Sequence, residues 1–211
     1  RAVHKCSQEY QNRNYKMLLL SIISLTVGVG MNEFGATENR TTFLAVAIAS
    51  TLFYIYFMEI SIQMDSLTKL LNRRCFDKHI KQLSYDTAIV FFDVNQFKSI
   101  NDNYGHKHGD IVLQQVASNI RYVFGNMGYL YRIGGDEFAM ILKPGQLEKM
   151  NYLLMVELLE QRLDKVRQNE NPILPSVSIG HAIYREGMNK ADVISLADQR
   201  MYIHKNGSGR S

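Results

Sequence analysis

The sequence predicts a domain built of helices and strands, of the α/β or α+β class, that follows two membrane-spanning helices. Residues 1–64 contain two long runs without a charged side chain. From residue 65 onward, helical apolar spacing alternates with short apolar runs typical of strands. A composition of 46% hydrophobic and 21% charged residues over 211 positions excludes a disordered chain, and it fits one globular domain with an additional apolar segment.

The overall charge and the cysteines limit the kind of protein without identifying it. The formal charge is +4 and the pI is about 9.0, which suits a nucleotide, a nucleic acid or an anionic membrane as partner. Cys6 and Cys75 stand far apart without a CxxC spacing, so we expect neither a zinc site nor a disulfide framework, and we expect a reducing compartment. Since the first residue is Arg rather than Met, the chain is expected to be part of a longer protein.

The two uncharged runs are Met17–Met31, MLLLSIISLTVGVGM, and Thr41–Met58, TTFLAVAIASTLFYIYFM. About 20 apolar residues cross a bilayer core, so we expect spans at about 16–34 and 41–60 within a membrane region over 1–64. The alternatives are two buried core helices or a signal peptide. A signal peptide is disfavoured because a second apolar run follows at once and no small-residue cleavage site stands out.

The charges that flank the runs predict an orientation. Four Lys or Arg side chains precede the first run, whereas the loop over 32–40 has one arginine against two glutamates. Positive residues favour the cytoplasmic side, so both ends of the pair are expected in the cytoplasm. We therefore expect a multi-pass protein of the cell inner or plasma membrane, with the domain over 65–205 in the cytoplasm.

The first elements after the membrane region are a helix, a strand and a second helix. Apolar residues recur at helical spacing over Ser66–Leu83, which predicts an amphipathic helix. The run TAIVFFD over Thr87–Asp93 is too apolar to have a solvated face, so we expect a central strand with Asp93 at its end. A further amphipathic helix is expected over Asp110–Val123.

A β-hairpin is expected next, from the runs GYLYRI over 128–133 and EFAMILK over 137–143. Gly134 and Gly135 separate the runs, and a glycine pair supplies the positive φ angles of a tight turn, so the two strands should pair antiparallel. The remaining elements follow in order: a helix over 146–168, a strand over 176–184, a helix over 191–205 and a flexible tail over 206–211.

Acidic side chains stand at the ends of two predicted strands, Asp93 on one and Asp136 with Glu137 on the other. Taken singly, a strand-terminal Asp is usually a cap or turn residue, and an acidic hairpin tip is usually solvated. If the two strands are neighbours, their carboxylates meet at one edge of the sheet and offer the oxygen ligands that Mg²⁺ prefers. Two such ions are typical of phosphoryl transfer, because the charge to be stabilised lies on phosphate oxygens.

The segment NQFKSINDNYGHKHGD over 95–110 is rich in polar residues and glycine, and is interpreted as a binding loop followed by a helix start. Lys98 would neutralise a triphosphate, Asn101 offers both a donor and an acceptor, and the Asp110 carboxylate would accept hydrogen bonds from the N–H edge that guanine has and adenine lacks. Composition alone favours a polar surface turn instead.

Five blocks, in order, resemble the GGDEF domains of diguanylate cyclases. They are SLTKLLNRRCFD, FFDVNQFKSINDNYGHKHGD, RIGGDEF over Arg132–Phe138, SVSIGHA and ADQRMYIHK. The resemblance extends over residues 65–205 and implies a ferredoxin-like fold of the nucleotidyl-cyclase type, with a central, mainly antiparallel sheet flanked by helices. It also implies the binding of Mg²⁺ or Mn²⁺, two ions per GTP site, and the joining of two GTP into cyclic di-GMP.

The resemblance further implies a role for each matching residue. These roles are metal binding by Asp93, by Asp136 and by the backbone carbonyl of Val94; general-base catalysis by Asp136, with Glu137 as a second acidic candidate; stabilisation of the transition state by Lys98; guanine recognition by Asn101 and Asp110, with His106 between them; and a contact from Lys205 to the triphosphate.

Each domain of this family binds one GTP, so the resemblance implies a homodimer. The expected partners are therefore GTP, a second copy of the chain and a lipid bilayer, and no nucleic acid is expected. Two departures from the family are visible. The RxxD product-inhibition site is replaced by Gly-Asn-Met-Gly over 125–128, and the arginine that usually follows the late lysine is displaced to Arg210.

Two other functions remain open at this point. One is a catalytically silent GTP-binding signalling module, against which the intact acidic turn argues. The other is a different nucleotidyl cyclase, or a relative of the polymerase palm, which would use the same two ions and make another product. Asp110 favours guanine in either case.

Overall fold

The computed structural model describes residues 19–27, 29–30, 40–61 and 63–207. The chain divides into two compact units, one within residues 5–63 and one from Met64 onward. Each unit has its own arrangement of elements. The second unit contains the sheet and the acidic residues singled out above.

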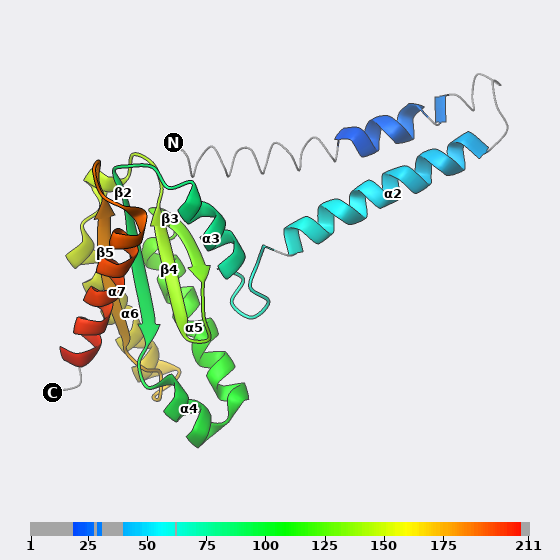
Figure 1. Ribbon diagram of the computed structural model, residues 1–211. Coiled ribbons are helices and arrows are strands. Elements are labelled where there is room, and N and C mark those ends of the chain that lie inside the picture. The colour runs from blue at the N-terminus through cyan, green and yellow to red at the C-terminus, as the bar shows by residue number, and fades with distance from the viewer. Residues whose placement is uncertain (1–18, 28, 31–39, 62, 208–211) are drawn as a thin grey trace. The chain divides into compact units, whose positions relative to one another are not determined.

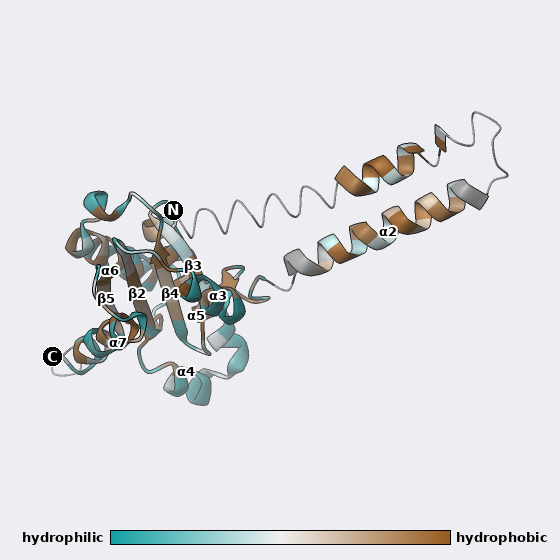
Figure 2. Cartoon of the chain, turned by 45° about the horizontal axis from the view of Figure 1, so that its top comes forward, coloured by the Kyte–Doolittle hydropathy of each residue, from teal (hydrophilic) through white to brown (hydrophobic). Residues whose placement is uncertain are grey.

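The described part of the first unit is helical, with helix α2 over Arg40–Ser61 and helical residues 19–27. Small side chains lie where these segments pack, since Ser21, Ala45 and Ala49 are the buried residues, and the Ser24 hydroxyl donates to the Ala45 carbonyl at 3.4 Å. Figure 2 shows the predominance of apolar residues along both segments. Many large apolar side chains are nevertheless exposed, among them Leu20, Ile22, Val27, Phe43, Leu44 and Phe53.

The structure does not support the two membrane spans that the sequence predicted. Among the described residues, no helix combines the length and the hydropathy that crossing a bilayer requires. The first expected span, at about 16–34, lies partly outside the described residues.

The second unit is built on a mixed sheet of five strands in the order β1-β3-β4-β2-β5. Neighbouring strands pair antiparallel except for β1 and β3, which pair parallel. The expected mainly antiparallel sheet and its hairpin are therefore confirmed. The strands are β1 over Leu71–Asn72, β2 over Thr87–Val94, β3 over Gly128–Arg132, β4 over Glu137–Leu142 and β5 over Val177–Tyr184.

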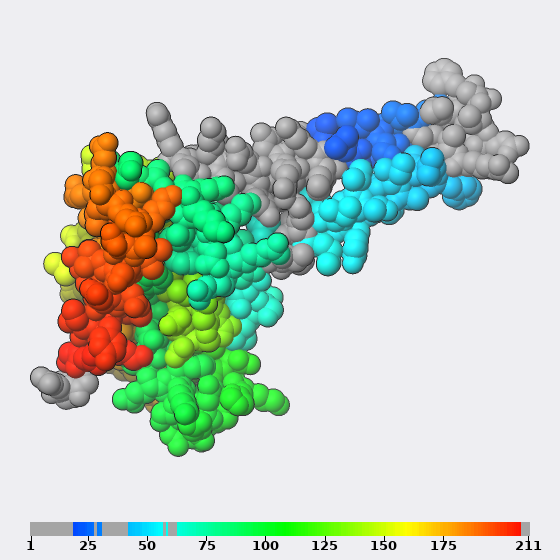
Figure 3. Space-filling model, viewed as in Figure 1, coloured from blue at the N-terminus to red at the C-terminus, as the bar shows by residue number. Residues whose placement is uncertain are grey.

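Helices cover both faces of this sheet. Figure 1 shows α3 and α7 on one face and α5 and α6 on the other, and Figure 3 shows α7, in orange and red, along its side of the unit. The helices are α3 over Arg73–Lys81, α4 over Phe97–Tyr104, α5 over His106–Phe124, α6 over Tyr152–Asn169 and α7 over Lys190–Gly207, and a short 3₁₀ helix covers Leu147–Lys149.

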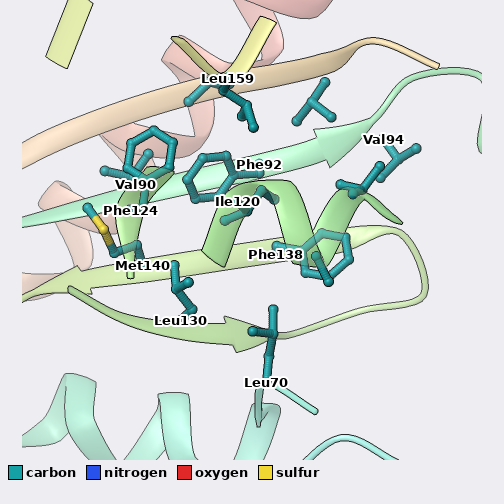
Figure 4. Close-up of a cluster of buried hydrophobic side chains, with 14 of the residues drawn as sticks. Leu70, Val90, Phe92, Val94, Ile120, Phe124, Leu130, Phe138, Met140 and Leu159 are labelled. Atoms are coloured by element: carbon teal, nitrogen blue, oxygen red, sulfur yellow. The ribbon is translucent and has the colours of Figure 1, made fainter. Parts of the chain in front are cut away.

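The apolar core has two halves, one on each face of the sheet. Alternate residues of β2 contribute to opposite halves, with Val90 and Phe92 facing α5 and α6, and Ile89 and Phe91 facing α3 and α7. Figure 4 shows the first half, in which the ring of Phe124 lies edge-on to Phe92, with ring centroids 5.1 Å apart. Because all eight residues of β2 are buried, this strand is central, as its sequence predicted.

The predicted helix over 66–83 is wrong in its first half. Helix α3 begins only at Arg73, where the Asn72 side chain accepts a hydrogen bond from the Cys75 N–H and caps it. Before that point, the Asp65 carboxylate accepts hydrogen bonds from the N–H and the hydroxyl of Thr68. These local side-chain hydrogen bonds favour a turn over a helix.

Three further expectations are corrected by the structure. Gly134 and Gly135 are not among the positive-φ residues described, so the hairpin turn does not use glycine for that reason. The helix expected over 146–168 starts instead at Tyr152, because the Asn151 side chain caps it by accepting from the Leu154 N–H. A polar stretch taken as a binding loop also contains helix α4, which composition alone did not reveal.

Candidate functional site

The site begins where strands β2 and β4 lie side by side. Asp93 near the end of β2 pairs directly with Glu137 at the start of β4, so the two carboxylates leave the same face of the sheet. The Asp93 side chain is largely buried, with 10% of its surface exposed. The condition on which the sequence interpretation depended, that these two strands are neighbours, is therefore met.

Helix α7 brings a cation and a further carboxylate to this edge. The Lys205 ammonium lies 2.6 Å from the Asp93 carboxylate and donates a hydrogen bond to it. Asp198 lies two helical turns before Lys205. A cavity of about 510 Å³ is lined by Asp93, Glu137, Asp198, Gln199, Met201, Tyr202, Ile203 and Lys205.

Negative charge accumulates around Glu137. Burial raises the pKa of the Glu137 carboxyl above its usual value, and the neighbouring carboxylates of Asp136, Asp93 and Asp198 raise it further, whereas Arg73 lowers it. Neither Glu137 nor Asp198 forms an ion pair with a described residue. This arrangement destabilises the charged carboxylates of the free protein, and a bound cation would relieve the repulsion.

The hairpin turn holds Asp136 beside the end of β2. The Asp136 carbonyl accepts a hydrogen bond from the Val94 N–H at 3.1 Å. Glu137 folds back over Gly134, since a Cβ atom on Gly134 would lie 2.5 Å from the Glu137 Oε2 atom. The lack of a side chain on Gly134 leaves room for the Glu137 carboxylate, and its φ angle is not positive.

The connection from β2 to α4 is fixed to strand β5 by Asn95. Its backbone N–H and its side-chain amide both donate to Ser176, and its side-chain oxygen accepts from the Ser178 hydroxyl at 2.7 Å. Gln96 follows in the left-handed conformation with φ 55°, and its side chain makes no capping hydrogen bond to the described N-terminus of α4. The first N–H groups of α4 thus remain available to an anion.

Helices α4 and α5 meet closely at Gly109. A Cβ atom at this position would lie 2.0 Å from the Asn101 Oδ1 atom and 3.2 Å from the Phe97 ring, so a larger residue would displace the Asn101 amide. The contact places the Asn101 amide against the first turn of α5, beside Asp110. Lys98, His106 and Asp110 are exposed, and their side chains make no hydrogen bond or ion pair with the described residues.

The structure thus groups the predicted residues into two sets. Asp93, Glu137 and Lys205 form a set with direct contacts or shared lining, and Asn101 lies against Gly109, the residue before Asp110, where α4 meets α5. Arg210, whose phosphate contact the sequence put in question, lies outside the described residues.

Sequence reasoning missed two residues of this region, Asp198 and Asn95. Asp198 is seven residues before Lys205, a spacing that places two side chains on one face of a helix, and this signal was available. Asn95 gave no comparable signal, because its partners lie more than 80 residues away in the sequence.

The side chains of the described residues supply only some of the ligands that a divalent cation needs. No three His, Cys, Asp or Glu side chains of the described chain converge as a complete set of metal ligands. Two paired carboxylates with a neighbouring backbone carbonyl nevertheless offer hard oxygen ligands, and Mg²⁺ usually keeps several waters or takes oxygens from a substrate phosphate. The uncompensated charge at Glu137 is consistent with such an ion.

Comparison with known proteins gives a consistent result. Residues 62–211 match the family model described as "Diguanylate cyclase, GGDEF domain". The probable diguanylate cyclase DgcI of Escherichia coli is 38% identical over 176 residues, which is 82% of this chain and 37% of that protein. The chain spans only between 19% and 37% of the length of the curated relatives YkoW, MucR, DosC and DgcI.

Solved structures resemble the second unit and part of the first. The coiled coil and GGDEF domain of DgcB from Caulobacter crescentus, in complex with c-di-GMP, aligns with a TM-score of 0.62 at 27% identity, covering 81% of this chain and 96% of that one. The GGDEF domain of TpbB from Pseudomonas aeruginosa aligns with a TM-score of 0.57 at 32% identity, covering 68% and 89%.

Proposed function

The chain belongs to the GGDEF-domain diguanylate cyclase family, and on that premise we propose that it is an active diguanylate cyclase that condenses two GTP into cyclic di-GMP. The observation that carries the proposal is the direct pairing of Asp93 with Glu137 at the end of two central strands, next to Lys205. Paired carboxylates and a lysine at one edge are the groups that nucleotidyl transfer needs.

We propose that Asp93, Asp136 and the Val94 carbonyl hold Mg²⁺ or Mn²⁺, with two ions per GTP site. When bound, such ions neutralise the phosphate oxygens and stabilise the charge that develops during transfer. Asp93 contributes a carboxylate that is already fixed by burial. Val94 contributes from the same strand end, where its N–H is tied to Asp136.

The substrate site extends from this edge to the junction of α4 and α5. We propose that Asn101 and Asp110 recognise the guanine edge, with His106 beside them at the start of α5. The uncapped N-terminus of α4, together with Lys98, suits the phosphates, because helical N–H groups and a lysine both attract anions. Lys205 would exchange its Asp93 partner for the triphosphate.

The proposed reaction forms two phosphodiester bonds. The 3′ oxygen of each GTP attacks the α-phosphorus of the other, the bond to the β-phosphate breaks, and diphosphate leaves. The proton of each 3′ hydroxyl passes to a carboxylate. The candidates for this role are Asp136, as the family resemblance implies, and Glu137, which follows it at the start of β4.

Each site holds one nucleotide, so the proposal requires two copies of the domain that face each other. We propose that the helices of the first unit supply the contact between copies, because they expose many large apolar side chains. Dilution of the purified chain below its dimerisation constant should then abolish activity, and a monomer with full specific activity would contradict this part of the proposal.

The proposed function is tested with the full chain, GTP and either Mg²⁺ or Mn²⁺, and with mass spectrometry of the product. We expect cyclic di-GMP from the wild-type dimer and none from Asp93→Asn. A verified dimer that binds GTP without product would favour the silent signalling module. A cyclic product of another mass would favour a different nucleotidyl cyclase.

We also propose that the region before Met64 attaches the protein to the cell inner membrane, with the GGDEF domain in the cytoplasm. The support is the pair of uncharged runs and the apolar side chains exposed on α2 and residues 19–27. Fractionation of cells that express the full chain tests this. Recovery in the soluble fraction, without detergent, would refute it.

A further inference from the structure

The turn that carries the acidic residues is held by donors from three separate elements. Its Gly135 carbonyl accepts two hydrogen bonds from Arg132, from Nη2 at 2.7 Å and from Nε at 3.2 Å. Its Ile133 carbonyl accepts from Arg73 Nη1 at 3.2 Å, and its Asp136 carbonyl accepts from the Val94 N–H at 3.1 Å. Backbone carbonyls of the turn therefore accept hydrogen bonds from Arg132, from Arg73 at the start of α3 and from Val94 at the end of β2.

Arg132 is itself fixed by a carboxylate outside the turn. Its Nη1 atom lies 3.2 Å and 3.3 Å from the two oxygens of Asp65. Only 15% of the Arg132 side chain and 21% of the Asp65 side chain are exposed, so solvent screens this pair weakly. A guanidinium has donors in a rigid fork, so one arginine can bridge the carboxylate and the turn carbonyl at the same time.

Asp65 is held in place in turn. Its carboxylate accepts from the Thr68 N–H at 2.8 Å and from the Thr68 hydroxyl at 2.7 Å, and its backbone N–H donates to the Leu70 carbonyl at 2.7 Å. Leu70 is buried, and Figure 4 shows it near Leu130 at the edge of the apolar cluster. The anchor of Arg132 is thus tied to the core of the unit.

Arg73 makes a weaker contribution to the same turn. Its other partner is Asp77, at 3.4 Å, and their side chains are 64% and 54% exposed. Exposed pairs of this kind contribute little, so Arg73 is not held as Arg132 is. This difference singles out Arg132 as the main external support of the turn.

Resting on the proposed function, we propose that Arg132 is a positioning residue: clamped by Asp65, its guanidinium holds the Gly135 carbonyl and thereby fixes where Asp136 and Glu137 lie. The next two residues after Gly135 are the acidic pair. The Glu137 side chain rests against Gly134, so a shift of the turn moves its carboxylate relative to Asp93. Arg132 touches neither substrate nor metal in this role.

The test compares Arg132→Lys and Asp65→Asn with the wild-type chain. Lysine keeps the charge and removes the fork, and asparagine keeps the shape and removes the charge. Arg167→Lys is the matched control, because Arg167 also donates to a backbone carbonyl, that of Leu174, which is not part of the acidic turn. Two quantities are measured: hydrogen exchange of the amides over residues 133–138, and kcat with the KM for GTP.

We expect faster exchange over 133–138 in Arg132→Lys and Asp65→Asn, with unchanged exchange in β2 and β5. We also expect kcat to fall about tenfold to a hundredfold with KM nearly unchanged, since small displacements of catalytic groups have effects of this size. The control should match the wild type in both measurements.

Two results would overturn the positioning role. One is unchanged exchange in the turn of both variants. The other is exchange that rises equally throughout the sheet, which would show a merely structural role. If the wild-type chain makes no cyclic di-GMP, the proposed function fails, and the exchange data together with Mn²⁺ binding measured by electron paramagnetic resonance still decide whether Arg132 orders the turn.

Discussion

Asp65 and Glu137 belong to the same compact unit and are both half-buried, yet the pKa values of their carboxyl groups are displaced in opposite directions. Burial alone would raise the pKa of Asp65, but hydrogen bonds from Thr68 and the pair with Arg132 outweigh it and lower that pKa. Burial raises the pKa of Glu137, and neighbouring carboxylates raise it further. The negative charge of Asp65 is balanced by hydrogen bonds and by Arg132, whereas Glu137 has no ion-pair partner among the described residues.

Asp65 therefore belongs to a region that stabilises the fold, and Glu137 belongs to a region whose charge a ligand can balance. A carboxylate that accepts several hydrogen bonds and an ion pair stabilises the folded chain. Carboxylates gathered without enough cations cost stability, and they are usually found where a substrate or metal completes the site. Four changes would break or sharpen this comparison.

The largest effect is expected for Glu137→Gln. Cyclase activity should fall by about a hundredfold or more, the size usual for loss of a general base. Stability at neutral pH should rise, because the raised pKa means that ionised Glu137 destabilises the folded state. Product formation and urea unfolding would be measured together.

The sign of the stability change depends on pH in a defined way. The folded protein binds the Glu137 proton more tightly than the unfolded chain, so wild-type stability falls as pH rises from the unfolded pKa through the folded pKa. The advantage of Glu137→Gln should therefore vanish in acid. A variant less stable than the wild type at neutral pH would contradict this account.

Gly109→Ala should weaken substrate binding. The new Cβ atom would lie 2.0 Å from the Asn101 Oδ1 atom, so the amide must leave its place. Loss of one well-placed hydrogen bond to guanine should raise the KM for GTP about tenfold. The control is Gly207→Ala, where an added Cβ atom meets nothing within 4 Å. Equal KM values for the two variants would argue against Asn101 as a guanine ligand.

Lys205→Met should distinguish the contact of Lys205 with Asp93 from its proposed contact with the triphosphate. In the free protein the ammonium neutralises Asp93 at 2.6 Å, and its removal should increase Mn²⁺ affinity without nucleotide by up to about fivefold, the scale of a partly exposed ion pair. Affinity for GTP should fall in the same variant. Electron paramagnetic resonance of free Mn²⁺ gives the first quantity, and unchanged Mn²⁺ binding would show that Lys205 does not occupy the metal position.

The fourth change is Asp65→Asn, measured here as stability. Because the folded pKa of Asp65 is lowered, its contribution is present above the unfolded pKa and is lost as pH falls through the folded pKa. The variant should lose roughly 1–2 kcal/mol at neutral pH, the scale of hydrogen bonds to a charged group. Unfolding free energies of the variant and the wild type that fail to converge at a pH below the folded pKa of Asp65 would indicate another cause.

Local patterns in the sequence predicted much of the fold. The apolar run of β2 and the two strands of the hairpin were correctly expected, since burial of a strand is visible in its own composition. The start of α3 was misplaced because the hydrogen bonds that Asp65 accepts from Thr68, and that Asn72 accepts from Cys75, compete with helical periodicity. The helix over 97–104 was missed because its polar residues resemble a loop.

The candidate site was predicted only in part. The sequence placed Asp93 and Glu137 together only if their strands were neighbours, and the antiparallel pairing of β2 with β4 meets that condition. The roles assigned to Lys98, Asn101, His106, Asp110 and Asp136 remain predictions. The contacts of Asp198, Asn95 and Arg132 were not foreseen.

By itself, the sequence determined the family, the alternation of helices and strands, and the acidic turn, because each depends on residues that are close together in the chain. Only the tertiary structure decided which polar side chains meet. Lys205 reaches Asp93 across 112 positions, and Arg132 reaches Asp65 across 67. Periodicity reports which face of an element is buried. The order and register of the strands then determine which distant charges are paired and which are left for a ligand.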